Sequence, residues 1–293
     1  MAKRPMGPTV SQRILGAELR KLREAKEMSL EVVADALGYS ETKISRIETA
    51  RNLVHKNDVT LLLNLYEVDD QEQRDDLLDL SKPRRREKGW WNAYSDVVPN
   101  KRWALVRLEN EAERLRSYQA AFIPGLLQTE EYTAALVEMS SPTLAAESRQ
   151  RVVEMHRARQ QILTREFPVE LWAVIDETAL RRLAAMPDKI ARAQFARLLE
   201  AAELPTVTIQ VLPLSIGLHT GMNGAFTLIG FPDPAGQIVF LDSRTGGMFL
   251  EESRHVASFD QDFAHLQAES LGKCDSLELI RFIASDNDLS RTD

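Results

Sequence analysis

The sequence predicts two folded domains: an all-α N-terminal domain of five helices over residues 11–81, and a larger α+β domain over residues 100–293 with a four- to five-stranded sheet. The 293 residues exceed the roughly 150 residues of an average domain. Apolar residues recur with helical spacing in the first segment, whereas β-rich runs alternate with helical patterns beyond residue 169. A basic and aromatic segment, residues 82–99, separates them and is interpreted as a linker.

The composition excludes several classes of protein. Hydrophobic residues make up 44% of the chain and charged residues 28%, the balance of a globular protein rather than of a disordered or fibrous one. Cys274 is the only cysteine, which excludes an intramolecular disulfide and a cysteine-built zinc site. No apolar run reaches the roughly 18 residues of a membrane span, and the basic N-terminus lacks the apolar segment of a secretory signal. We therefore expect a cytoplasmic protein without a membrane anchor.

The charge is distributed unevenly. Residues 1–56 carry 11 Lys or Arg against 7 Asp or Glu, and residues 82–88 carry five against one, although the whole chain has a net charge of −7. Residues 57–81 carry one basic residue against eight acidic ones. Local basic segments on an acidic chain favour a small nucleic-acid-binding module joined to a domain with another task.

Capping residues and apolar stripes place the five N-terminal helices. Ser29 is suited to cap the second helix, which Gly38 ends, and Ser40 is suited to cap the third. Asn57 is predicted to cap the fourth helix, and residues 70–81 to form the fifth. The first helix covers about residues 11–25, and the stripes of the first four helices are Ile14, Leu15, Leu19 and Leu22; Val32, Val33, Ala34 and Leu37; Ile44 and Ile47; and Val59, Leu62, Leu63 and Tyr66.

The second and third helices have the spacing of a helix-turn-helix. A small residue, Ala34, allows the next helix to cross closely, and Gly38 permits the positive φ of a tight turn. Ile44 and Ile47 then anchor the third helix by its buried side. In this arrangement the second helix of the pair lies in the major groove of DNA. The alternative is a five-helix bundle whose turn contains a glycine but which does not bind DNA.

Three segments of this domain, LRKLR (19–23), SLEVVA (29–34) and SETKISRIE (40–48), resemble Xre-type, lambda-repressor-like DNA-binding domains. The resemblance covers about residues 11–80. It implies a five-helix lambda-repressor-like fold in which Glu48, at the end of the recognition helix, supports the fold rather than contacting bases.

The outward residues of the third helix are the candidate DNA contacts. Thr42, Lys43 and Arg46 project from its first two turns, so we expect them to contact base edges. A single helix-turn-helix covers few base pairs, so we expect a homodimer on a two-fold-related site in double-stranded DNA. Phosphate contacts are expected from the helix N-terminus and from Ser40, Ser45, Arg20, Arg23 and Arg51.

The predicted linker has two parts. Pro83 ends the preceding helix, and the basic residues around it either add phosphate contacts or form a solvated hinge, which the sequence leaves open. Trp90, Trp91 and Tyr94 follow, and we favour docking of these rings on the second domain over stacking on bases.

The second domain mixes helices and strands. A stripe of Leu105, Leu108, Ala112 and Leu115 predicts a helix over about residues 100–116, and Asp176 is placed to open a helical turn. Residues 118–123 form a short extended piece, and the sheet is expected mainly from residues 169–251. Further helices are predicted over 130–138, 143–165, 188–203 and two closing segments, and strands over 169–175, 206–212, 225–229, 237–241 and an optional 248–251.

Several runs in this domain are similar to the C-terminal domain of actinobacterial WhiJ-type regulators. The longest are IPGLLQTEEY (123–132), RQQIL (159–163) and IDETALRR (175–182), with VLP (211–213) and GAF (224–226) in the same pattern. The resemblance implies an antitoxin-like transcription regulator encoded beside a small partner protein. It also implies that this domain binds that partner or a signal.

We expect neither an enzyme nor a cofactor nor a metal. His255, Asp262 and His265 share a predicted helix, but His255 and Asp262 lie about 10.5 Å apart along it, too far to bind one ion. Asp176 and Glu177 at a strand end could form a catalytic carboxylate pair, but helix capping by Asp176 explains them more simply. The glycine-rich segment 217–224 lacks the Lys-Ser/Thr pair of a phosphate loop, so we favour a connector over a ligand lid.

The resulting hypothesis is a sequence-specific DNA-binding transcription regulator, cytoplasmic and nucleoid-associated, whose C-terminal domain binds a small protein that tunes DNA occupancy. The alternative is a regulator that responds to a small-molecule ligand bound in the C-terminal α+β domain, with the 169–251 sheet and the glycine-rich segment as the pocket. An enzyme fused to a DNA-targeting module is a third reading.

Overall fold

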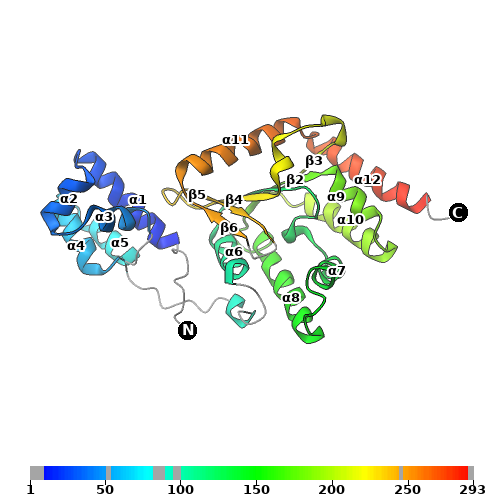
Figure 1. Cartoon of the computed structure of the whole chain (residues 1–293), viewed down its shortest axis with the longest axis horizontal. Helices are drawn as coiled ribbons and strands as arrows, with labels where there is room; N and C mark the ends of the chain where they lie inside the picture. The colour runs from blue at the N-terminus through cyan, green and yellow to red at the C-terminus, as the bar shows by residue number, and fades with distance from the viewer. Residues whose placement is uncertain (1–9, 51–53, 82–89, 95–99, 244–246, 290–293) are drawn as a thin grey trace. The chain divides into compact units, whose positions relative to one another are not determined.

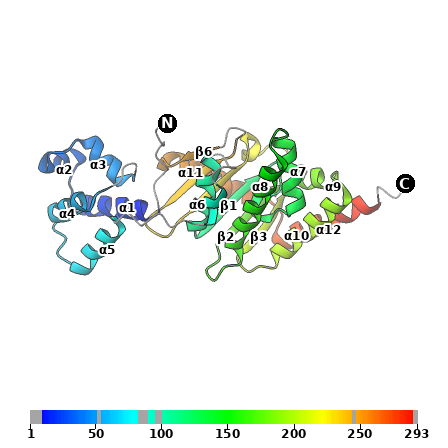
Figure 2. The same ribbon diagram turned by 90° about the horizontal axis from the view of Figure 1, so that it is seen from below.

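The computed structural model of the protein describes residues 10–50, 54–81, 90–94, 100–243 and 247–289. The chain forms two compact units, one that contains the helices up to residue 81 and one built on a β-sheet in the described residues of 90–230 and 237–289. The helices and strands of both units can be followed in Figures 1 and 2. Each unit has a hydrophobic core of its own.

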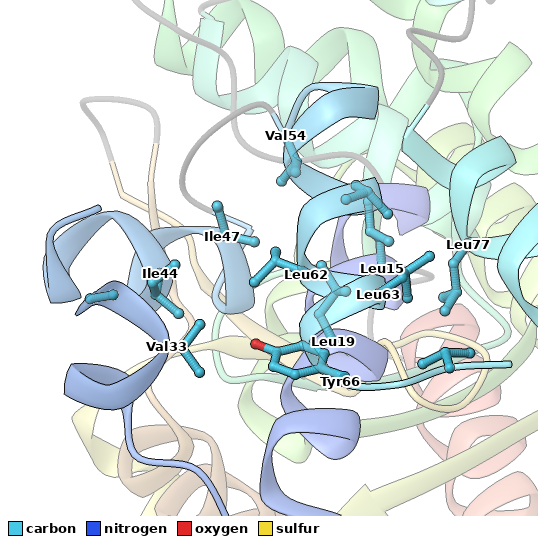
Figure 3. Close-up of a cluster of buried hydrophobic side chains, with 13 residues drawn as sticks. Leu15, Leu19, Val33, Ile44, Ile47, Val54, Leu62, Leu63, Tyr66 and Leu77 are labelled. Atoms are coloured by element: carbon cyan, nitrogen blue, oxygen red, sulfur yellow. The ribbon is translucent and has the colours of Figure 1, made fainter. Parts of the chain in front are cut away.

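The first unit consists of the five helices that the sequence predicts. Their core is a cluster of buried side chains to which every helix contributes, among them Leu19, Val33, Ile44, Leu63 and Leu77 (Figure 3). Burying one such side chain contributes about 1.5–3 kcal/mol, so this cluster holds the five short helices together. The helices are α1 (Val10–Ala25), α2 (Leu30–Leu37), α3 (Glu41–Glu48), α4 (Lys56–Leu65) and α5 (Gln71–Ser81).

Capping residues begin α2 and α3 as predicted. The side chains of Ser29 and Ser40 accept hydrogen bonds from the backbone N–H groups of Val32 and Lys43. Gly38 ends α2 with a φ of +65°. The prediction for α4 is wrong in one detail: this helix begins at Lys56, so Asn57 lies inside its first turn instead of capping it.

The packing of α1 against α3 depends on a glycine that the sequence analysis did not single out. A Cβ atom at Gly16 would lie 2.6 Å from the carbonyl oxygen of Glu48 and 2.8 Å from that of Ile47. These are backbone atoms, which cannot turn aside as a side chain does. Glycine at position 16 therefore lets the C-terminal end of α3 rest directly on α1.

The second unit is built on a six-stranded mixed sheet with the order β3-β2-β1-β4-β5-β6. β1 pairs with β2 and β2 with β3 in parallel, whereas β4 is antiparallel to both β1 and β5, and β5 to β6. The strands are β1 (Arg114–Gln119), β2 (Glu170–Asp176), β3 (Val207–Leu212), β4 (Phe226–Gly230), β5 (Gln237–Leu241) and β6 (Met248–Leu250).

One strand of this sheet was missed by the sequence analysis. The helix predicted over residues 100–116 ends at Glu111, and residues 114–119 form β1 in the middle of the sheet. Leu115 fits the stripe of the preceding helix, yet it is fully buried in β1. Pairing with β2 and β4 decides its conformation, and such tertiary contacts override local preference. The sheet therefore has six strands rather than four or five.

Helices cover both faces of the sheet. One face, which carries Tyr118, Val174 and Phe226, packs against Phe263 and Leu266 of α11. α6, α7 and α8 lie toward the other face in both views (Figures 1 and 2). The helices are α6 (Asn100–Glu111), α7 (Glu130–Ser140), α8 (Ala146–Arg159), α9 (Glu177–Ala184), α10 (Asp188–Ala202), α11 (Ser253–Glu269) and α12 (Lys273–Leu289). The 3-10 turns are η1 (Trp90–Tyr94), η2 (Gly125–Leu127), η3 (Gln160–Leu163), η4 (Leu214–Ile216) and η5 (Thr220–Asn223).

The aromatic part of the predicted linker belongs to the second unit. Trp91 of η1 is buried against Val106 of α6 and Met155 of α8, with Trp90 and Tyr94 packed beside it. This confirms the interpretation that these rings dock on the second domain. The remaining linker residues, 82–89 and 95–99, lie outside the described part of the chain. Among the described residues, no helix is both long and apolar enough to cross a membrane.

Candidate nucleic-acid interface

The third helix has one buried and one polar exposed side. Ile44 and Ile47 are at most 2% exposed and fix α3 in the core. Thr42 and Arg46, four residues apart, are exposed on the same helix face. Within the described part of the chain, Arg46 forms no ion pair or hydrogen bond through its side chain. This guanidinium group is thus available to an external acceptor such as guanine or phosphate.

Lys43, the third predicted base contact, is engaged inside the domain. Its Nζ atom donates a hydrogen bond of 3.0 Å to Oδ1 of Asp58 on α4 and lies 3.2 Å from the ring centroid of Tyr39. Its side chain retains 37% exposure. The sequence analysis singled out neither Asp58 nor Tyr39 as part of the site, because a contact between α3 and α4 leaves no periodic signal in the sequence.

The predicted phosphate contacts Ser40 and Ser45 differ in position. Ser40 is exposed at the N-terminus of α3, where its hydroxyl accepts from the N–H of Lys43 at 3.2 Å. The other N–H groups of this first turn favour an anion at the same place. Ser45 is half-buried on the next turn, and its carbonyl oxygen accepts from the hydroxyl of Thr49.

The predicted phosphate contact Arg23 has a structural role instead. Its Nε and Nη2 atoms donate to the two carboxylate oxygens of Glu48 at 2.6 and 3.0 Å, and its Nη1 donates to the carbonyl oxygen of Met28 at 2.7 Å. The side chains of Arg23 and Glu48 are only 12% and 5% exposed. The hydrogen bonds that the guanidinium donates to this carboxylate raise the pKa of Arg23 further. Buried in this way, Arg23 does not reach a phosphate. Glu48 supports the fold, as the family resemblance implies.

The structure describes only one of the two other arginines that are predicted to contact phosphate. Arg20 is 58% exposed on α1, and its Nε atom donates to Glu24 at 2.7 Å. A pair this exposed contributes little to stability and opens easily toward another anion. Arg51 lies outside the described residues.

The second unit contains a groove between the sheet and its helices. The groove encloses about 200 Å³ and is lined mainly by apolar side chains such as Leu115, Ile123 and Met155. At its wall, Glu109 of α6 and Arg159 of α8 form a bidentate ion pair, with side chains 3% and 12% exposed. Burial raises the pKa of the Glu109 carboxyl, and the neighbouring Arg159 opposes this only in part.

The glycine-rich segment does not line this groove, contrary to the pocket expected from the sequence. Gly221 rests directly on the ring of Tyr118, leaving no room for a side chain at that position. His219 is buried beside Asp176, with 3.6 Å between Nε2 and Oδ2, and Tyr118 donates to the same carboxylate oxygen. The segment is thus anchored on the sheet through Gly221 and His219, while Leu218 and Met222 stay exposed.

The carboxylate pair at the end of β2 has structural partners. Asp176 caps α9, since its Oδ1 atom accepts from the N–H of Thr178 at 2.8 Å. Glu177 accepts from Arg181 and from the backbone N–H of Leu214. The explanation of Asp176 as a helix cap is confirmed.

Two family models match the chain. Residues 14–77, which span most of α1 to α5, match a helix-turn-helix domain. Residues 103–282, which make up more than half of the chain, match a domain of unknown function, DUF5753. No curated protein and no solved structure matches the chain. The likeness to Xre-type domains is thus supported at the level of a helix-turn-helix domain, and the likeness to WhiJ-type regulators stays a resemblance.

Proposed function

The chain belongs to the DUF5753 family and carries a helix-turn-helix domain ahead of that region, and from this premise we propose that it is a sequence-specific DNA-binding transcription regulator. The observation that carries the proposal is the exposed face of α3, where Thr42 and the unengaged Arg46 stand on a helix anchored by Ile44 and Ile47. A rigid helix with outward hydrogen-bond donors is what readout of base edges in the major groove requires.

In this proposal the base contacts are Thr42, Arg46 and, with the part of its ammonium group that remains exposed, Lys43. Ser40, Ser45, Arg20 and Arg51 contact phosphates and set the register of α3 on the duplex. We further propose a homodimer that binds two half-sites related by two-fold symmetry. Selection of genomic fragments by the full-length protein tests sequence preference, because enriched fragments should share an inverted repeat.

Arg46→Ala is expected to weaken binding to the selected site by about 1–3 kcal/mol, since a bidentate contact to guanine is worth that much. Its effect on random duplex should be smaller, because sequence readout is what the change removes. Titration of labelled duplexes at one fixed salt concentration measures both affinities.

Arg182→Ala is the matched control, since Arg182 is also an exposed arginine on a helix but belongs to α9 of the other unit. This variant loses the same charge and should bind the selected site like the unmodified protein. Equal losses for both variants would mean that Arg46 acts only through net charge.

For the C-terminal domain we propose binding of a small protein that tunes DNA occupancy. The resemblance to WhiJ-type regulators supports this, and so do the apolar side chains that segment 214–222 exposes. Leu214, Leu218 and Met222 are 53%, 86% and 60% exposed. Purification from the native cell should recover a stoichiometric small protein. Leu218→Glu should release it, whereas Phe167→Glu, at a site outside this segment that is also strongly exposed, should retain it.

The groove beside Glu109 and Arg159 favours a second candidate function, a regulator that responds to a small molecule. An apolar cavity with a few polar groups is the usual form of a ligand site. A metabolite that stays bound through purification, and is identified by mass spectrometry after denaturation, would support this candidate over the partner protein.

A further inference from the structure

Three side chains form a compact cluster at the N-terminal end of the recognition helix. They are Tyr39 in the turn before α3, Lys43 in the first turn of α3, and Asp58 in the first turn of α4. Oδ1 of Asp58 accepts from the Tyr39 hydroxyl at 2.6 Å and from Nζ of Lys43 at 3.0 Å. The ammonium group also lies over the Tyr39 ring, 3.2 Å from its centroid.

The charges of this cluster compensate one another. Burial alone would raise the pKa of the Asp58 carboxyl, but the hydrogen bonds from Tyr39 and Lys43 outweigh it and hold this pKa below its usual value. Burial alone would lower the pKa of Lys43, but the bonds to Asp58 and Tyr39 raise it. At neutral pH the cluster thus contains one full negative and one full positive charge in direct contact.

We propose that Asp58 is a specificity-determining residue, which restrains Lys43 and so keeps its ammonium group from binding DNA phosphates regardless of sequence. The inference rests on the proposed DNA-binding function and assigns a role to a residue outside the recognition helix. Asp58 is only 14% exposed, so it acts on DNA through Lys43 rather than by direct contact.

The physical reason is the origin of non-specific affinity. Binding to random duplex comes almost entirely from cations that neutralise phosphates and release condensed counterions. A lysine already paired with a buried carboxylate releases fewer of them, because its charge is compensated before DNA arrives. Arg46 on the same helix has no such partner among the described residues. In this proposal Arg46 is therefore free to contact DNA, whereas Lys43 is restrained by Asp58.

The test compares the full-length protein with Asp58→Asn on random-sequence duplex over a range of salt concentrations. Asparagine keeps an oxygen that accepts from Tyr39 but removes the charge that holds Lys43. The slope of log K against log salt should steepen by about 0.9, the value for one added phosphate contact. With equal affinities at 1 M salt as the reference, this added slope makes the affinity of Asp58→Asn for random duplex ~8-fold higher at 0.1 M salt. Affinity for the selected site should rise less, so the ratio between the two falls.

Two further variants separate release of Lys43 from a general change of charge. Lys43→Gln combined with Asp58→Asn should bind random duplex with the affinity and slope of the unmodified protein, because the freed cation is gone. Asp76→Asn removes an equally negative but fully separate carboxylate from the exposed face of α5 and should leave the slope unchanged. Far-UV circular dichroism verifies folding of each variant, and Asp58→Ser replaces Asp58→Asn if the latter does not fold.

An unchanged slope for Asp58→Asn, an equal gain for Asp76→Asn, or a gain that persists without Lys43 would each overturn the inference. None of these results affects the proposed function, which fails on a separate result: an unmodified protein that binds its selected site no better than random duplex. If the unmodified protein and Asp58→Asn both bind no duplex at low salt, both proposals are wrong.

Discussion

Glu48→Ala is expected to lower the free energy of unfolding of the N-terminal domain by about 3–5 kcal/mol, the usual loss when one member of a buried ion pair is removed. Glu48 joins the end of α3 to α1 through two hydrogen bonds from Arg23, and both side chains are almost fully enclosed. The variant leaves the Arg23 guanidinium buried, with the carbonyl oxygen of Met28 and the more distant, exposed carboxylate of Glu24 at 3.7 Å as its remaining partners. A domain of this size is stable by little more than the expected loss, so much of it should unfold at room temperature.

The chain itself supplies separate probes for the two domains. All four tryptophans lie at residue 90 or beyond, so their fluorescence reports on the second domain, whereas far-UV circular dichroism reports on the helices of both. In urea, Glu48→Ala should shift an early circular dichroism transition and leave the fluorescence transition in place. Lys21→Ala breaks an exposed pair with Glu18 and should change neither transition.

A second variant tests whether the loss comes from the unpaired charge. Replacing both partners, with Arg23→Met and Glu48→Leu, should recover most of the stability, because apolar groups of similar volume often substitute for a buried ion pair. If the double variant is as unstable as Glu48→Ala, the geometry of the pair and not the unpaired charge is what matters.

The N-terminal domain could be predicted largely from its sequence because its signals are local. The serine caps of α2 and α3, the glycine turn and the spacing of Ile44 and Ile47 all act within a few residues. Apart from the cap of α4, the failures concern contacts between helices. Arg23 has the appearance of a surface arginine in sequence, and only the approach of α3 to α1 at Gly16 converts it into the buried partner of Glu48.

The second domain was harder to predict for the same reason. Five of its strands carry a β-rich composition, but β1 continues the leucine spacing of α6 and is a strand only because β2 and β4 flank it. The groove was misplaced because its walls come from α6, β1, α7, α8 and the middle of the sheet, which are far apart in sequence. For the glycine-rich segment the sequence favoured a connector over a ligand lid, and the contact between Gly221 and Tyr118 anchors it on the sheet away from the groove.

Arg159→Met is expected to destabilise the second domain by about 3–5 kcal/mol at neutral pH, because it leaves the buried carboxylate of Glu109 without its partner. Glu109, the partner of Arg159, is only 3% exposed. Methionine retains much of the apolar contact of the arginine stem but offers no hydrogen bond to the carboxylate. Trp91 packs against α6 and α8, and Trp103 belongs to α6, so the shift of the fluorescence transition in urea measures the loss.

The pH dependence of this loss identifies its cause. Burial holds the pKa of Glu109 above its usual value even with Arg159 present, and removal of Arg159 raises it further. A carboxyl whose pKa is higher in the folded state contributes stability that is present below its unfolded pKa and is lost as the pH rises through the folded pKa. Lowering the pH from neutral should therefore favour protonation of Glu109 in the variant and narrow its stability gap to the unmodified protein. With Glu109→Gln added to Arg159→Met, the gap should no longer depend on pH, and a gap in Arg159→Met that widens on acidification would contradict this account.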